Sequence, residues 1–170
     1  MNPKIKDQSV LWDEIAVKKQ SLPDAELRIS HEREIRWYRW FLLLLPVKPG
    51  DVVLDCGCGD GFLSVELARR GAIVTGFDIS ESAIEVAKRR ALLYGVSERT
   101  RFISGSFENL NLEGSQQDGI YGIAILHHVN TEIAAQKIKE LLKPGRRAIF
   151  MENSTNNGLL MWIRTKIVHN

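Results

Sequence analysis

Three glycines at alternate positions, Gly57, Gly59 and Gly61, lie between a short apolar run and an expected helix. Glycine is needed where the backbone takes unusual dihedral angles, or where a ligand must approach without meeting a Cβ atom. A tight turn without a ligand is the alternative, although a turn alone does not require three alternate glycines. Asp78 ends the next apolar run, and a carboxylate there can accept hydrogen bonds from both hydroxyls of an unphosphorylated ribose. The pattern therefore predicts a site for a nucleoside-containing ligand.

The loop lacks the dinucleotide fingerprint, G-x-G-x-x-G. Counted from Gly57, that fingerprint places its third glycine at position 62, which is Phe62 in this sequence. A nucleotide-dependent oxidoreductase is therefore disfavoured.

Two histidines, His127 and His128, follow the fourth expected strand at its carboxyl end. A histidine titrates near neutral pH and could act as a general base, with His127 as the first candidate. Alternatively, one ring packs and the other caps or hydrogen-bonds the loop. Cys56 and Cys58 lie within the glycine loop, where their spacing suits reduced thiols in a cytosolic protein. Because zinc takes about four nitrogen or sulfur ligands, we expect no metal site.

Strands and helices alternate from residue 52 onward. The expected strands are "VVLDCG", "AIVTGFD", "TRFISGS", "GIYGIAIL" and "RRAIFMEN", and the segments between them carry helical patterns with Gly71 and Gly95 as stops and Ser80 as a cap. This alternation predicts an α/β fold, Rossmann-like and doubly wound, with a mainly parallel sheet and helices on both faces.

An N-terminal helical segment, residues 1–46, precedes this domain. Its main helix is expected to start with Asp24 as N-cap and to end before Pro46. An aromatic cluster within it predicts packing onto the neighbouring domain, and the alternatives are a lid over a ligand or a helix on a membrane surface. The cluster comprises Trp37, Tyr38, Trp40 and Phe41.

Five ordered stretches resemble the class I S-adenosylmethionine-dependent methyltransferases, in particular the small-molecule subgroup that includes the quinone-biosynthesis enzymes. "VVLDCGCGDGFLSVELARRG" is similar to their first motif, and "VTGFDIS" to their second-strand acid. "GSFENL", "GIYGIAILHHV" and "LLKPGRRAIFMEN" are similar to their later strand ends. The match runs from about residue 50 to 153.

The resemblance implies a role for each matching position. The glycines would pass the methionine end of S-adenosylmethionine, with Asp55 near its amino group, and Asp78 would bind the ribose. Ile79 would flank the adenine ring, and Ser106 and Phe107 would meet its edge. The neighbouring Glu108 is expected to be a loop carboxylate, and the alternative is that it replaces the acid that the family often has where Ser106 stands. The implied cofactor-binding residues are Asp55, Gly57, Cys58, Gly59, Gly61, Asp78, Ile79, Ser106 and Phe107.

Composition limits the remaining choices. A chain of 170 residues with 44% hydrophobic and 26% charged residues is long enough for one domain with its own core. The net charge of +2 gives no reason to expect nucleic acid as a partner. The longest apolar run, residues 41–45, is far shorter than the ~20 residues needed to cross a bilayer, and no secretory signal is evident, so we expect a cytoplasmic protein.

The resemblance implies further strands after residue 153, and only 17 residues follow Asn153. We therefore expect residues 47–170 to form an S-adenosylmethionine-binding domain without its last two strands. Our first hypothesis is a methyltransferase that acts on a small-molecule acceptor by in-line displacement, with residues 1–46 as part of a cap or lid. The alternative is a truncated domain or partner subunit that binds the cofactor without turnover. Self-association is expected through the exposed fifth-strand edge or the N-terminal helix.

Overall fold

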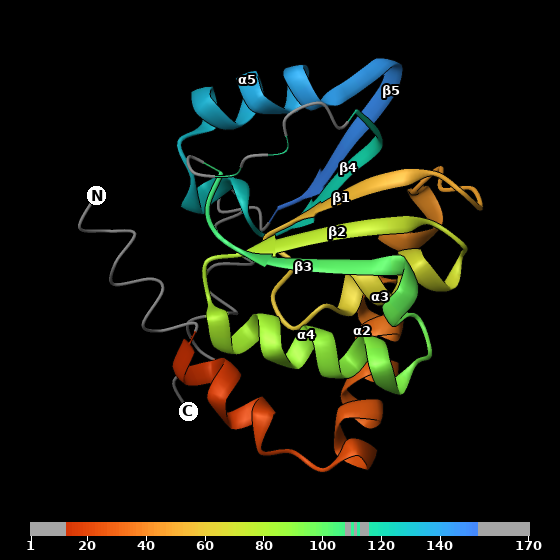
Figure 1. Cartoon of the computed structure of the whole chain (residues 1–170), viewed down its shortest axis with the longest axis vertical. Coiled ribbons are helices and arrows are strands. Elements are labelled where there is room, and N and C mark those ends of the chain that lie inside the picture. Colours follow the sequence, from red (N-terminus) through yellow and green to blue (C-terminus); the bar gives the residue numbers. More distant parts are fainter. Residues whose placement is uncertain (1–12, 108–109, 111, 113–115, 153–170) are drawn as a thin grey trace, which may run out of the picture.

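A computed structural model describes residues 13–107, 110, 112 and 116–152, and its centre is a five-stranded sheet (Figure 1). The strand order is β3-β2-β1-β4-β5, and every neighbouring pair is parallel. The fold class predicted from the sequence is thereby confirmed. The strands are β1 (Val52–Cys56), β2 (Ile73–Asp78), β3 (Thr100–Ser104), β4 (Gln117–Ile123) and β5 (Leu142–Met151).

The strand order reverses at β1. This strand pairs with β2 on one side and with β4 on the other, so that Asp55 lies between Gly76 and Tyr121. Ligands of open parallel sheets bind outside the carboxyl ends of the strands at such a reversal. The glycine loop follows β1 directly and therefore lies at this point.

Helices cover both faces of the sheet. Figure 1 shows α5 on one face and α3 and α4 on the other, with α2 on the same side as α3 and α4. One apolar core joins α2 and α3 to the sheet, and a second lies beneath α5. The helices are α2 (Asp24–Leu44), α3 (Phe62–Arg69), α4 (Glu81–Leu93) and α5 (Thr131–Leu141), with short 3-10 turns η1 (Ser97–Arg99) and η2 (Leu126–His128); residues 13–20 are also helical.

The helix ends follow the expected caps with one exception. Ser80 accepts a hydrogen bond from the backbone of Ala83 at 3.0 Å and so caps α4, as predicted. The prediction that Asp24 is the N-cap of α2 is wrong, because Pro23 occupies that position and Asp24 is the first helical residue. Since Arg89 bonds its carboxylate, Asp24 joins α2 to α4 instead.

The aromatic cluster of α2 is divided between two faces. Phe41 is buried, and Tyr38 packs against the same core, as expected for a helix docked on the domain. The predicted packing is wrong for the other two residues, because Trp37 and Trp40 are 79% and 71% exposed. One helix therefore presents aromatic rings both to the core and to solvent.

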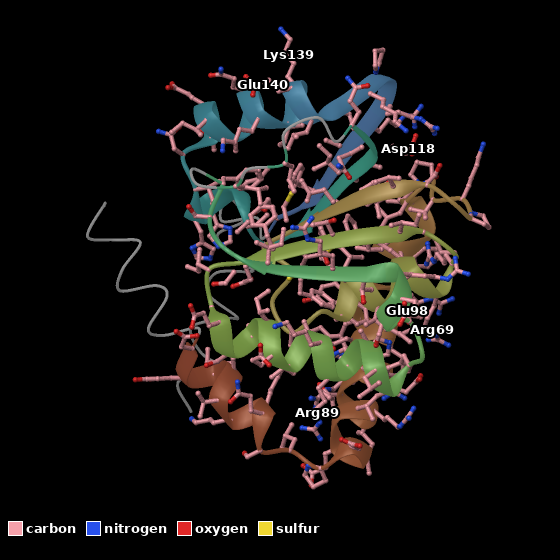
Figure 2. All side chains as sticks on the ribbon, viewed as in Figure 1. Arg69, Arg89, Glu98, Asp118, Lys139 and Glu140 are labelled. Carbon is pink, nitrogen blue, oxygen red and sulfur yellow. The ribbon has the colours of Figure 1, made fainter. Side chains whose placement is uncertain are left out.

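Charges of both signs are interspersed over much of the surface. Figure 2 shows Lys139 beside Glu140 at the outer side of α5, and Glu98 and Arg69 at the right-hand side of the view. Within the part of the chain that the structure describes, no helix is both long and apolar enough to span a membrane.

Candidate functional site

A cavity of about 260 Å³ opens at the carboxyl ends of the strands. Its wall combines the glycine loop, the end of β2, the segments after β3 and β4, and the helix of residues 13–20. The lining residues are Ile15, Ala16, Lys19, Gly57, Gly59, Asp60, Phe77, Asp78, Ile79, Ala83, Gly105, Ser106, Phe107, Ile123, Ala124, Ile125, His128 and Val129.

The glycine loop turns sharply and presents bare backbone to this cavity. The backbone N–H of Cys58 donates to Phe77 at 2.9 Å, which ties the loop to the end of β2. Gly59 has a φ of +52°, and a Cβ atom added to it would meet nothing within 4 Å. The space beside this glycine therefore belongs to the cavity, as expected where a ligand approaches the backbone.

Gly61 is required for a different reason. It precedes α3 with a φ of +80°, and a Cβ atom added there would lie 2.7 Å from the Cβ atom of Ala87 on α4. It does not line the cavity. Its absent side chain allows α3 and α4 to approach each other, which is a packing role.

Asp78 is held at the cavity edge by backbone groups. Its carboxylate accepts hydrogen bonds from the N–H of Gly59 at 2.8 Å and of Ser80 at 3.0 Å. Burial raises the pKa of Asp78, while these backbone hydrogen bonds oppose the rise. A carboxylate has about four lone-pair sites, so two bonds leave capacity for hydroxyl donors of a ligand.

Asp55 and Cys58 lie behind the cavity rather than in its wall. Asp55 is 1% exposed, and its carboxylate accepts a hydrogen bond of 2.6 Å from the hydroxyl of Ser64. Burial raises the pKa of Asp55 to about 7. Burial also raises the pKa of the Cys58 thiol well above its usual value, so this thiol is protonated and inert at neutral pH.

The positions expected near an adenine ring are brought together. Ile79, Ser106 and Phe107 come from two different loops, and all three line the cavity. Phe107 also packs edge-on against Phe77, with their ring centroids 5.1 Å apart. Glu108, the neighbouring loop carboxylate, lies outside the described residues.

The two histidines occupy different positions. His128 lines the cavity, and burial, together with the neighbouring His127, lowers its pKa. His127 does not line it; its side chain is 48% exposed, and its Nδ1 lies 2.6 Å from a carboxylate oxygen of Glu152. The two rings are in contact, with centroids 3.9 Å apart. The structure therefore places the second histidine, and not the first candidate, at the cavity.

Glu152 was missed by the sequence analysis. One of its oxygens accepts hydrogen bonds from the N–H groups of Ile125 and Leu126, both at 2.9 Å, and the other faces His127. Burial would raise its pKa, but these hydrogen bonds outweigh burial and lower it. The expected fifth strand, "RRAIFMEN", includes this acid, but no pattern in the sequence links residue 152 to residue 127.

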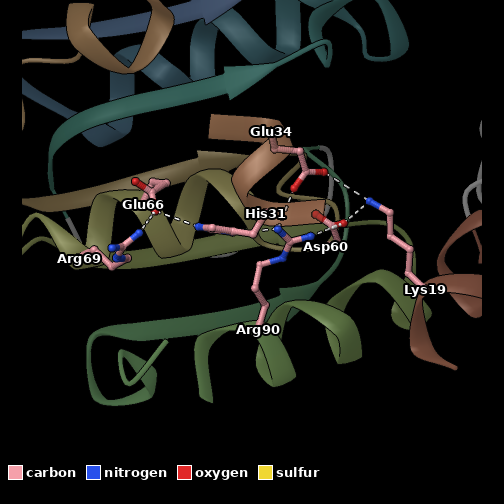
Figure 3. A network of polar contacts seen from close by, with 7 residues as sticks. All are labelled: Lys19, His31, Glu34, Asp60, Glu66, Arg69 and Arg90. Atoms are coloured by element: carbon pink, nitrogen blue, oxygen red, sulfur yellow. Dashed lines mark hydrogen bonds and ion pairs between the residues drawn. The ribbon is translucent and has the colours of Figure 1, made fainter. Parts of the chain in front are cut away.

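A network of charged side chains joins the N-terminal helices to the glycine loop (Figure 3). Lys19 contacts the carboxylate of Asp60, which lies between two of the loop glycines, and lies 3.4 Å from Glu34 of α2. Arg90 of α4 binds both acids, each at 2.7 Å. Burial alone would raise the pKa of Asp60, but the charges of Arg90 and Lys19 outweigh it and lower that pKa.

The network continues through a buried histidine. His31 is 0% exposed; its Nδ1 lies 2.9 Å from Arg90, and its Nε2 lies 2.9 Å from Glu66. A guanidinium can only donate, so Nδ1 must accept, and the Nε2–H then donates to the carboxylate. Arg69 completes the chain by binding Glu66 at 2.7 Å. Within the described residues, no group of three or more histidine, cysteine, aspartate or glutamate side chains is arranged to hold a metal ion.

Comparison with known proteins shows the family to which the chain belongs. Residues 53–145, more than half of the chain, match the family described as a methyltransferase domain. The chain belongs to this methyltransferase family. The predicted resemblance to class I S-adenosylmethionine-dependent methyltransferases is thus confirmed, and S-adenosylmethionine is the cofactor that the family uses.

Two curated methyltransferases and one solved structure illustrate the likeness. The chain is 34% identical over 144 residues to a sterol 24-C-methyltransferase of Gibberella zeae, covering 83% of this chain and 36% of the relative. The chain is 37% identical over 108 residues to a ubiquinone biosynthesis O-methyltransferase of Coxiella burnetii, covering 63% of this chain and 45% of that relative. The chain thus spans less than half the length of these relatives.

The solved structure supports the fold. Magnesium protoporphyrin IX methyltransferase from Synechocystis, determined with bound S-adenosylmethionine, superposes with a TM-score of 0.64 at 22% identity, covering 88% of this chain and 76% of the Synechocystis chain.

Proposed function

We propose that this methyltransferase binds S-adenosylmethionine in the cavity at the carboxyl ends of β1, β2 and β4 and transfers its methyl group to a small-molecule acceptor. The observation that carries the proposal is the position of Gly59 and Asp78, which meet at one wall of the cavity with a hydrogen bond of 2.8 Å between them. Bare backbone and an oriented carboxylate are the two features that a nucleoside with an amino-acid tail requires.

The residues of the cavity fit the parts of this cofactor. Asp78 would accept hydrogen bonds from the ribose hydroxyls, because its backbone partners already fix the carboxylate at the wall. Ile79 and Phe107 would flank the adenine ring, and the hydroxyl of Ser106 would meet its edge. Gly57 and Gly59 would pass the methionine end. Asp55 supports the loop from behind through Ser64 and would act on the cofactor only at a distance.

A second part of the cavity wall would hold the acceptor. It is formed by the helix of residues 13–20 and the segment after β4, and most of its side chains are apolar. They include Ile15, Ala16, Ile123, Ile125 and Val129. The names of the sterol and ubiquinone relatives agree with an apolar acceptor. Residues 1–46 would then act as the cap that the sequence analysis expected.

When bound, S-adenosylmethionine supplies a methyl group activated by its sulfonium. The chain's own contribution is to hold the acceptor atom in line with that carbon and to exclude water. An acceptor that must lose a proton also needs a base. His128 suits this role, because it lines the cavity and its lowered pKa keeps the imidazole neutral at neutral pH. Glu152 would position His127 against it.

Calorimetry tests the cofactor assignment. We expect S-adenosylmethionine and S-adenosylhomocysteine to bind, and a nicotinamide dinucleotide not to bind. Asp78→Ala should abolish measurable binding, because it removes the ribose acceptor, whereas Asp118→Ala, which changes a carboxylate far from the cavity on β4, should leave binding unchanged. The absence of binding by both sulfur compounds would overturn the proposal.

Turnover is tested separately from binding. Release of S-adenosylhomocysteine in the presence of quinol, phenol and sterol acceptors would identify a methyltransferase. Binding without release in any mixture would favour the alternative, a cofactor-binding domain without turnover. For an acceptor that loses a proton, we expect His128→Gln to reduce kcat by roughly 10²-fold or more, the usual contribution of a general base. Glu152→Gln should reduce kcat less and leave cofactor binding unchanged.

A further inference from the structure

The outer face of α2 carries large apolar side chains that the domain leaves uncovered. Trp37 and Trp40 are 79% and 71% exposed, and Leu43 and Leu44 are 68% and 70% exposed. Residues separated by three, four or seven positions share one side of a helix, so these four lie on one side of the last three turns of α2. Contiguous exposed apolar surface of this kind marks a place of interaction.

Basic side chains share this face. Arg33 and Arg36 are exposed and lie in the same helical rows as Trp37 and Trp40, and Arg39 lies at the edge, with its guanidinium 5.3 Å from the ring centroid of Trp40. Within residues 32–44, which the structure describes throughout, Glu32 is the one exposed acid. No ion pair between these three arginines and a described carboxylate is present, so the face carries an excess of positive charge.

We propose that this outer face of α2, formed by Arg33, Arg36, Trp37, Trp40, Leu43 and Leu44, binds the surface of an anionic lipid bilayer. A helix with Trp and Leu between basic residues lies in the plane of the interface, with its rings at headgroup depth and its cations among lipid phosphates. The long arginine stems let the charges reach those phosphates while the apolar side chains are buried. The proposal concerns a surface distinct from the cavity and does not depend on the proposed methyl transfer.

Charge favours the bilayer over a second copy of the chain. A two-fold dimer through this face would place the face of one protomer against the same face of its partner. Arg33, Arg36 and Arg39 would then be concentrated at one interface, although the centres of protein interfaces are depleted in charged residues. An anionic bilayer instead complements these charges and accepts the apolar side chains together with them. The opposite side of α2 is not available, because Leu27, His31 and Leu42 are buried there.

Sedimentation with lipid vesicles tests the proposal. The whole chain is mixed with vesicles of phosphatidylcholine alone or of phosphatidylcholine with phosphatidylglycerol. We expect binding to the anionic vesicles only, and we expect 1 M salt to weaken it, since the Debye length there is about 3 Å. Arg33→Ala with Arg36→Ala should weaken binding by about fivefold for each arginine removed. Trp37→Ala with Trp40→Ala should remove it, and brominated lipids should quench the tryptophan fluorescence of the unchanged protein.

A matched control changes an exposed apolar and an exposed basic residue elsewhere. Ile133→Ala with Lys139→Ala, on α5 across the sheet, should leave vesicle binding unchanged. All substituted side chains are exposed, so urea unfolding should show each variant to be folded. The proposal is wrong if the unchanged protein fails to sediment with anionic vesicles, or if the tryptophan variant sediments equally well. A concentration-dependent dimer that the tryptophan variant loses, without vesicle binding, would assign the face to a second copy.

Discussion

Two carboxylates of the same cavity wall are held in opposite ways. Asp78 is fixed by backbone N–H groups from residues 59 and 80, and burial raises its pKa. Asp60 is fixed by the side chains of Lys19 and Arg90, whose charges outweigh burial and lower its pKa. The first anchor is built from a loop and the strand beside it. The second joins the loop to helices that are distant in the sequence.

This difference indicates different roles for the two carboxylates, one in binding a ligand and the other in holding the structure around the site. A carboxylate held by backbone groups keeps lone pairs for an incoming hydroxyl, because its partners are few and fixed in direction. A carboxylate that binds an ammonium and a guanidinium is already engaged with its charge neutralised. Asp78 is therefore suited to bind a ligand, whereas Asp60 is suited to fasten the N-terminal helices to the loop.

The largest expected effect comes from removing the centre of the second anchor. Arg90→Leu leaves Asp60, Glu34 and His31 without their shared donor at a side chain that is 0% exposed. Breaking a buried ion pair on one side costs about 3–5 kcal/mol, and we expect this loss in the free energy of unfolding measured with urea. The neighbouring Lys88→Ala should cost less than about 0.5 kcal/mol, because the Lys88 side chain is 52% exposed. Equal effects of the two substitutions would show that the network does not stabilise the fold.

The pH dependence of stability should distinguish the two carboxylates, because their pKa values shift in opposite directions, and this effect is smaller. The folded pKa of Asp60 is lowered, so its stabilising contribution is present above its unfolded pKa near 3.8 and is lost as the pH falls through the folded pKa. The folded pKa of Asp78 is raised, so its contribution is present below that unfolded pKa and is lost as the pH rises through the folded pKa. Asp60→Asn should therefore cost about 2 kcal/mol at neutral pH and less in acid.

For Asp78→Asn, the change in the free energy of unfolding should depend on pH in the opposite direction to that of Asp60→Asn. Relative to the unchanged protein, this variant should become more stable as the pH rises from about 3 to 7, because the unfavourable buried charge is absent. Urea unfolding without cofactor at several pH values measures both differences. Parallel pH profiles for the two variants would contradict the distinction between the two anchors.

The sequence predicted the first anchor far better than the second. The glycine spacing, the strand-end position of Asp78 and the cap at Ser80 are local patterns, so they could be read without knowing the tertiary structure. The contacts between Arg90 and Asp60 and between His127 and Glu152 join residues 30 and 25 positions apart, and no periodicity marks such pairs. The exposure of Trp37 was missed for the same reason, because helical spacing gives the face of a residue and not what covers it.

The smallest predicted effect concerns Ser80, where the helix of residues 13–20 meets the start of α4. Ser80 caps α4 by accepting from Ala83, and its hydroxyl also donates to Asp13 in the helix of residues 13–20. Ser80→Ala should cost about 1 kcal/mol for the lost cap, and Asn130→Ala, which removes the cap of α5, should cost about the same.

A double-mutant cycle then isolates the contact between the helix and the cap. Ser80→Ala and Asp13→Ala should show a coupling energy of about 0.5–1 kcal/mol in urea unfolding, because each removes one partner of the same hydrogen bond. Asn130→Ala and Asp13→Ala should be additive, since among the described residues the Asn130 side chain accepts hydrogen bonds at its own helix end, from the N–H groups of Glu132 and Ile133. Coupling in the first pair alone would show that the N-terminal helix is fastened to the site by the same serine that caps α4. Additivity in both pairs would leave the network around Arg90 as the main attachment of the N-terminal segment to the cavity.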